Sequence, residues 1–302
     1  MLTSSGHLTY CTNIHAGENW HDHFMALQKN FPGIKQIISP ESPMGIGLRI
    51  SNEASIEIEK DDNLILFQQW LTENDAYIFT MNGFPYGGFH HTVVKENVHT
   101  PDWTTDERVE YTKRLFNILA FLLPNEMDGG ISTNPLGYRH HFPTTELFEK
   151  AKKTGTENIL KVVLHLIELH RTTRKICHLD IEPEPDGMME TGHEFINWYE
   201  NDLLKIGIPF FANQLNISEE EADKLIRRHV QLCYDVCHFA IGFEPHKEII
   251  SLLAQKKISI GKIQISAALK SLITVDKFEK VKESFAQFDE PTYLHQVVAR
   301  TK

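Results

Sequence analysis

An aspartate and a histidine three residues apart, Asp235 and His238, are the residues of this chain whose types and spacing best suit metal chemistry. They lie at the end of the apolar run VQLCYDV, residues 230–236, which predicts a buried strand. A carboxylate and an imidazole at the carboxyl end of a barrel strand form half of a divalent-metal site. The alternative is a polar strand end at which His238 caps a helix that begins near Glu244.

A second group of acids, Asp180, Glu182 and Glu184, lies in the segment LDIEPEPDG. Alternation along a strand directs all three to the same side, and the flanking prolines end the strand. Acids that face the inside of a barrel need a metal or another cation, because an unpaired buried carboxylate is costly. Glu, Asp and His from successive strand ends make a mixed ligand set suited to Zn²⁺, Mn²⁺, Fe²⁺ or Mg²⁺. The alternative is a solvated acidic loop.

Further polar residues fall at the ends of predicted strands or in the loops behind them. We expect these residues to line a substrate-binding site: Asn13, His15, Asn82, His90, His91, Lys95 and Gln264. His295 lies further along the chain, and we expect it to lean over the same site as an additional metal ligand. Lys95 or Lys270 has the charge to hold an anionic group, although a solvated surface position is the simpler interpretation of either lysine.

Strands must position these residues, and strand-like runs alternate with amphipathic helices along the whole chain. Seven strands are predicted, over residues 8–14, 45–51, 77–84, 130–134, 175–182, 230–236 and 258–267. Strict alternation implies parallel strands joined by right-handed crossovers. Polar residues at the strand ends favour an α/β fold of the (β/α)₈ TIM-barrel type over an open sheet, and no Gly-x-Gly-x-x-Gly follows the first strand. Residues 291–299 are the candidate for an eighth strand.

The helices between the strands are predicted from apolar residues at helical spacing. They are expected from Gly17, over 61–74, from Thr104 to about 123, over 144–172 in two pieces separated by Thr154 and Gly155, over 218–229 and over 276–288. Thr104 with Glu107, and Ser218 with Glu221, have the spacing of a helix capping box.

Composition narrows the class of protein. The net charge of −11 over 302 residues argues against a protein that grips nucleic acid. The four cysteines are too few for a disulfide framework and predict buried thiols in a reducing compartment. No apolar run reaches membrane-spanning length, and the N-terminus lacks the pattern of a signal peptide. We therefore expect a soluble, cytoplasmic protein with one barrel domain over residues 1–302, no membrane insertion and no nucleic-acid partner.

The segment VQLCYDVCHFAIGFE resembles the sixth-strand motif of endonuclease IV, within the xylose isomerase-like TIM-barrel superfamily. The resemblance implies that Asp235 and His238 bind metal and that Glu182 has the place of the strand-five glutamate ligand. Longer motifs across nearly the whole chain resemble the metabolite traffic protein EboE family: LTYCTNIHAGENW, NGFPYGGFHHTVVKENVHTPDW, GGISTNP, IEPEPDGMMET, CYDVCHFAIGFE, KIQISAAL and YLHQVV. That family implies a gene cluster that moves a metabolite precursor across or toward a membrane, and a functional link to membrane proteins of the cluster.

Two departures from these families stand out. Gln264 occupies the place where the superfamily often has a metal-binding histidine on strand seven. EboE-like proteins also continue well past YLHQVV, which implies that 291–299 is a loop and that this chain lacks the last strand, as a C-terminally incomplete barrel would. The alternative is that the tail substitutes for that strand.

Together these observations predict a metal-binding barrel that acts on a small polar, sugar-like metabolite. The expected chemistry is metal-assisted isomerisation or epimerisation, with the ion on Glu182, Asp235 and His238 and with Glu184 as the base. One alternative is metal-dependent phosphoester hydrolysis of the endonuclease IV kind, which requires a basic rim that the acidic balance disfavours. The other is a protein that binds and hands over a metabolite without turnover.

Overall fold

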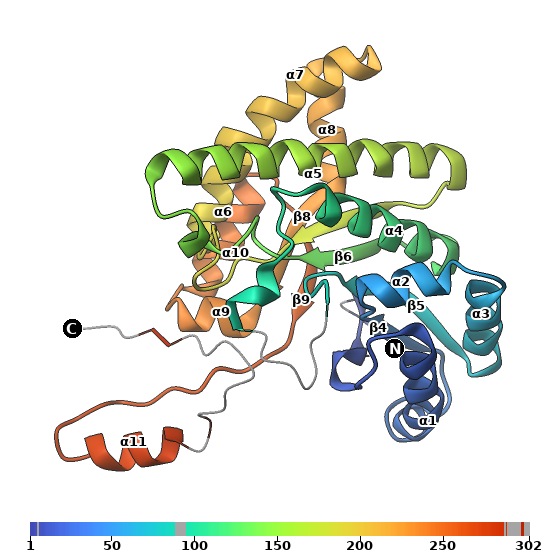
Figure 1. Ribbon diagram of the computed structural model, residues 1–302, viewed down its shortest axis with the longest axis horizontal. Helices are drawn as coiled ribbons and strands as arrows, with labels where there is room; N and C mark the ends of the chain where they lie inside the picture. The colour runs from blue at the N-terminus through green and yellow to red at the C-terminus, as the bar shows by residue number, and fades with distance from the viewer. Residues whose placement is uncertain (5, 88–94, 287, 289–296, 299–302) are drawn as a thin grey trace.

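A parallel sheet of seven strands forms the centre of the protein, which is known from a computed structural model that describes residues 1–4, 6–87, 95–286, 288 and 297–298. Each strand pairs with the next in chain order, and every pairing is parallel. The strands are β3 (Thr9–Cys11), β4 (Met44–Leu48), β5 (Ala76–Asn82), β6 (Gly129–Thr133), β7 (Cys177–Ile181), β8 (Val230–Asp235) and β9 (Ile260–Gln264). This order confirms the predicted α/β barrel topology, with seven of its strands in the described part of the chain (Figure 1).

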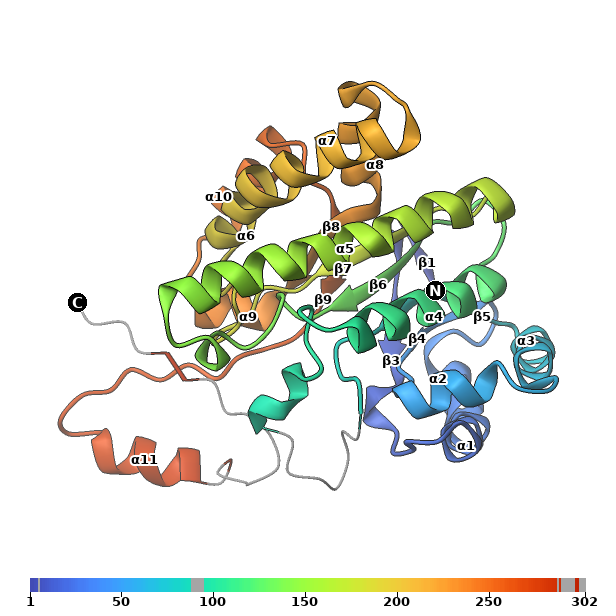
Figure 2. The same cartoon turned by 45° about the horizontal axis from the view of Figure 1, so that its top comes forward.

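Helices follow most of the strands and lie on the outside of the sheet (Figures 1 and 2). The α-helices are α1 (Trp20–Ile38), α2 (Asn52–Ile58), α3 (Asn63–Glu73), α4 (Asp106–Leu122), α5 (Thr145–Thr173), α6 (Gly192–Trp198), α7 (Leu204–Leu215), α8 (Glu219–His229), α9 (Val236–Ile241), α10 (His246–Gln255) and α11 (Phe278–Ala286). A π-helical turn, Tyr199–Leu203, joins α6 to α7, and short 3₁₀ turns span Thr12–Ile14, Lys95–His99 and Arg139–His141. A small antiparallel hairpin, β1 (Leu2–Thr3) with β2 (Gly6–His7), precedes the sheet. None of the described helices is long and apolar enough to cross a bilayer.

The sheet curls around a polar interior. Lys262 on β9 reaches across it, where Nζ donates to the Met81 carbonyl on β5 at 3.3 Å and to Ser132 Oγ on β6 at 3.0 Å. Only a strongly curved sheet brings one lysine to strands three and four positions away. Within the described residues no pairing joins the two end strands, β3 and β9.

A buried His178–Asp180 pair fills the same interior, with Nδ1 2.7 Å from Oδ1. Two glycines make room for it, because a Cβ on Gly261 would lie 2.0 Å from Asp180 Oδ1 and one on Gly130 2.3 Å from Asp180 Oδ2. Asp180 therefore pairs with His178 below the mouth of the barrel.

Several helix boundaries differ from the sequence prediction. Helix α5 is continuous across Thr154 and Gly155, because its buried face from Ala151 to Leu166 packs on both sides of Gly155 and outweighs the low helix propensity of one glycine. Thr105, not Thr104, caps α4, since Thr104 Oγ1 instead donates to Asp102 Oδ1 at 2.6 Å. The capping box of Ser218 and Glu221 on α8 is confirmed.

Near the candidate site, the observed ends of the strands and helices also differ from the predicted ones. The first strand ends at Cys11, and the next three residues form a 3₁₀ turn rather than extended chain. A helix, α9, begins directly after β8 and includes His238, whereas the sequence predicted no helix before Glu244. Asp235 caps α9 by accepting a hydrogen bond from the Cys237 amide, so the alternative in which His238 is a helix cap is wrong.

Candidate metal centre

The carboxyl ends of β7, β8 and β9 meet at one edge of the sheet, and each presents a polar residue there. Glu182 directly follows β7, Asp235 ends β8 and Gln264 ends β9. Asp235 pairs with Gln264 in the parallel register. Because the strands are neighbours, residues more than fifty positions apart in the sequence share one site.

Gln264 lies between the two acids. Its Nε2 donates to Glu182 Oε1 at 2.7 Å and to Asp235 Oδ2 at 2.8 Å. The other oxygen of Asp235, Oδ1, accepts from the Cys237 amide at 2.9 Å and from Ser266 Oγ at 2.5 Å. Asp235 is thus oriented by one pair of donors and turns its second oxygen into the site.

His238 lies against both glutamates of the β7 loop. Its Nδ1 is 3.6 Å from Glu182 Oε1, and its Nε2 is 3.8 Å from Glu184 Oε2. His238 Nδ1 is buried and makes no hydrogen bond within the described residues. A ring nitrogen that makes no hydrogen bond is available to a metal ion.

The electrostatics of the cluster also suit a cation. Among the described residues no lysine or arginine lies within ion-pair distance of Glu182 or Asp235, and the neighbours of Glu182 are the Gln264 amide, the Cys233 thiol and His238. Burial raises the pKa of Glu182 and Asp235 adds to this effect, while His238, the more distant Lys262 and the Gln264 hydrogen bond act against it. Two buried carboxylates held by neutral donors fit a divalent ion, which supplies the missing positive charge.

Cys237 joins this cluster, and the sequence analysis missed it as a site residue. One donor atom from each of Asp235, Cys237 and His238 lies within 4.8 Å of the others. The short spacing Asp-x-Cys-His at the start of a helix was the signal available in the sequence, because the first turn of α9 places residues two and three apart around one point.

His99 is a second residue that the sequence analysis missed. It is buried at the end of the 3₁₀ turn Lys95–His99, and its Nε2 lies 3.2 Å from Glu184 Oε1. Burial, with His141 and Arg108 adding to it, lowers the pKa of His99 to about 3, so the ring is neutral. No sequence pattern links His99 to Glu184, because they are joined only by the fold.

The predicted substrate-binding residues have mixed outcomes. Asn82 ends β5 and turns back on its own loop, where Oδ1 accepts from the Phe84 amide at 3.0 Å. Asn13 lies in the turn Thr12–Ile14, and the ring of His15 lies edge-on to Tyr10 with centroids 5.8 Å apart. Gln264 lies among the acids. Three predicted residues, His90, His91 and His295, lie outside the described residues, and only the backbone of Lys95 is described. The roles assigned to all of these residues stay predictions.

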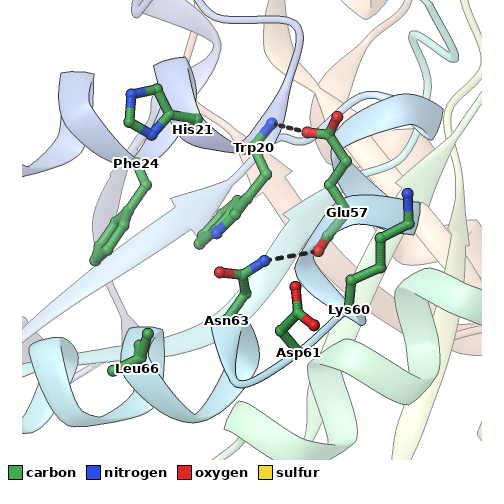
Figure 3. Close-up of a pocket in the computed structure, with 8 residues that line it drawn as sticks. All are labelled: Trp20, His21, Phe24, Glu57, Lys60, Asp61, Asn63 and Leu66. Atoms are coloured by element: carbon green, nitrogen blue, oxygen red, sulfur yellow. Dashed lines mark hydrogen bonds between the residues drawn. The ribbon is translucent and has the colours of Figure 1, made fainter.

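A separate pocket of about 400 Å³ lies between α1 and the turn from α2 to α3 (Figure 3). Trp20 and Phe24 form its apolar wall, and Glu57 accepts a hydrogen bond from the Trp20 amide at 2.7 Å. None of its lining residues belongs to the acid cluster, so it contributes nothing to the metal centre.

Comparison with known proteins yields solved structures only. No protein-family model matches the sequence, and no curated protein matches it. The structure of IolI protein with a binding zinc atom is similar over 83% of this chain and 70% of that chain, with a TM-score of 0.43 and 12% identity. SacUVDE is similar over 83% of this chain and 74% of its own, with a TM-score of 0.33 and 13% identity. The resemblance to EboE accordingly stays a prediction.

Proposed function

We propose that this chain is a divalent-metal-dependent barrel protein of the xylose isomerase-like type, related to the EboE family, that isomerises or epimerises a small polar, sugar-like metabolite. One observation carries the proposal. Glu182, Asp235 and His238 converge at the carboxyl ends of adjacent strands, and within the described residues neither acid has a lysine or arginine partner. In barrels of this topology, that end of the sheet is where ligands bind.

The residues of the site have two proposed roles, metal binding and proton transfer. Glu182, Asp235 and His238 would hold the ion, which would polarise a substrate carbonyl and the hydroxyl beside it. Glu184, next to His238 and His99, would take the proton from the carbon beside that carbonyl and return it to the neighbouring carbon. Neutral His99 would keep the Glu184 carboxylate oriented for both transfers.

Two other functions remain as alternatives. A phosphoester hydrolase would need cations to hold its phosphate, yet the described residues around Glu182 and Asp235 provide neither lysine nor arginine within ion-pair distance, and the chain carries a net charge of −11. A protein that only binds and hands over a metabolite would keep the metal or the ligand without exchanging substrate protons. The second alternative matches the EboE resemblance and is separated from the proposal by experiment.

Metal content tests the proposal first. Purified protein, supplied with Zn²⁺, Mn²⁺, Fe²⁺ or Mg²⁺ and then desalted, should retain about one ion per chain by elemental mass spectrometry. Glu182→Ala and Asp235→Ala should lose most of it, whereas Glu248→Ala, which removes an exposed acid of α10, should not. Wild-type protein without stoichiometric metal under all four conditions contradicts the proposal.

Proton exchange then separates turnover from handover. Metal-loaded protein is incubated with aldoses and ketoses in D₂O, and deuterium incorporation beside the carbonyl is followed by NMR. Exchange that disappears in Glu184→Gln supports isomerisation or epimerisation. Metal retention with no exchange on any candidate sugar favours the handover alternative.

A further inference from the structure

We infer that Cys237 is a thiolate ligand of the metal and that the ion this site selects is zinc. The inference rests on the proposed function, which allows four different ions. It selects one of them from the types of donor atom in the site. It also makes Cys237 the third protein ligand beside Asp235 and His238, with Glu182 as the carboxylate next to them.

Geometry is the first support. One donor atom from each of Asp235, Cys237 and His238 lies within 4.8 Å of the others. This separation allows one ion to contact all three after small side-chain adjustments, because zinc–ligand bonds are about 2.0–2.3 Å long. The three residues come from the end of β8 and the first turn of α9, so one strand–helix junction holds them together.

The hydrogen bonds of the cluster orient Asp235 and leave a ring nitrogen of His238 available. Asp235 Oδ1 accepts hydrogen bonds from the Cys237 amide and from Ser266, and Oδ2 accepts one from Gln264. His238 Nδ1 is buried and makes no hydrogen bond within the described residues. Cys237 is half-buried, whereas Cys233, the other thiol of the site, is fully buried and points to Glu182 Oε2 at 3.6 Å. Of the two thiols, only Cys237 has its sulfur close to donor atoms of both Asp235 and His238.

The chemistry of the donor set then selects the ion. Thiolate and imidazole ligands favour zinc, whereas carboxylates and water suit magnesium and manganese. Three protein ligands, with one position left for water or substrate, are the arrangement of a catalytic zinc site. When the zinc–sulfur bond forms, the thiol proton passes to solvent, and no oxidation or reduction is involved. Glu182, 3.6 Å from His238, is the neighbouring carboxylate that balances the charge of the ion.

Cobalt substitution tests the inference with a readout that is independent of activity. Metal-free protein is titrated with Co²⁺, and the wild type should show both visible d–d bands and a sulfur-to-cobalt charge-transfer band in the near ultraviolet. Cys237→Ser should lose the charge-transfer band and keep weaker d–d bands. Cys11→Ser, which alters another half-buried thiol, and Cys233→Ala should both retain it.

Zinc affinity and zinc X-ray absorption complete the test. Cys237→Ser should lower the affinity for Zn²⁺ about tenfold or more, because loss of even an outer partner of a ligand costs about 10- to 100-fold, while the affinity for Mn²⁺ should change less. Zinc-loaded wild type should show a sulfur neighbour at about 2.3 Å, absent in Cys237→Ser. Cobalt d–d bands without a charge-transfer band overturn the role of Cys237 and leave the metal site standing. Absence of any bound metal overturns this inference and the proposed function together.

Discussion

Gln264 Nε2 lies 2.7 Å from Glu182 Oε1 and donates a hydrogen bond to it. The same nitrogen serves Asp235 at 2.8 Å, so one uncharged amide stands between two buried carboxylates. An amide cannot neutralise either charge, and both acids therefore gain stability from a cation in their midst.

Gln264→Glu should destabilise the metal-free protein by about 1–3 kcal/mol, because it replaces a shared donor with a third carboxylate and leaves two acceptors unsatisfied. Added Zn²⁺ should recover most of this loss. The free energy of unfolding is measured by urea denaturation with and without metal. Gln69→Glu, an exposed change on α3, should alter neither value. A Gln264→Glu protein that is as stable as wild type without metal would show that the acids do not repel each other.

Glu182→Gln should stabilise the metal-free protein at neutral pH by about 0.5–2 kcal/mol, because it removes a buried charge; gains of this size are common for stabilising substitutions. Burial raises the pKa of Glu182, so the folded protein favours the protonated carboxyl. As the pH rises above the pKa that Glu182 has in the unfolded chain, the wild-type protein therefore loses stability. The advantage of the variant should therefore shrink at acidic pH. The same change should abolish the rise in melting temperature that metal produces in the wild type, which thermal melts at pH 5 and pH 8 would show.

His99→Gln should slow proton exchange about tenfold, the lower end of the range for loss of an outer partner, while the metal content and KM stay near wild type. The reason is that His99 contacts Glu184 through Nε2 and so holds the base rather than the ion. His21→Gln, an exposed change on α1 away from the acid cluster, is the matched control. A fall in metal content instead of exchange rate would place His99 in the metal site.

His229 should make the protein sensitive to acid. It is buried, and its Nδ1 donates to the Cys177 carbonyl at 2.7 Å. Burial lowers its pKa from 6.5 to about 4. The unfolded chain therefore protonates His229 near pH 6.5, whereas the folded protein protonates it only near pH 4. The free energy of unfolding falls by about 3 kcal/mol as the pH is lowered between these two values. Urea denaturation from pH 7 to pH 4 should show a shallower loss for His229→Gln than for wild type.

Gly261→Ala should destabilise the protein by about 1–3 kcal/mol, the usual cost of overpacking. Its Cβ would lie 2.0 Å from Asp180 Oδ1 and 2.7 Å from His178 Nδ1, and both of these side chains are buried. Asp180→Ala combined with Gly261→Ala should cost less than the sum of the two single changes. Gly33→Ala, where nothing lies within 4 Å of the new Cβ in α1, should be neutral or stabilising.

Much of the architecture was predictable from local pattern. Buried runs such as VQLCYDV and amphipathic stretches such as 218–229 have periods that identify strands and helices, and their alternation predicts a parallel sheet. The polar ends of β7, β8 and β9 then follow, because parallel strands expose their carboxyl ends at one edge. Asp235, His238, Glu182 and Gln264 were assigned to this edge in this way, and their roles there stay predictions.

Only the tertiary structure decided which of these residues meet, and which others meet them. The sequence by itself determined which segments form strands and helices and which polar residues lie near the strand ends, since both follow from short-range periodicity. The pairing of His99 with Glu184, the bridge made by Gln264, and the room that Gly130 and Gly261 leave for Asp180 all depend on register and curvature. Those are set by packing between segments far apart in the chain, and no local pattern records them.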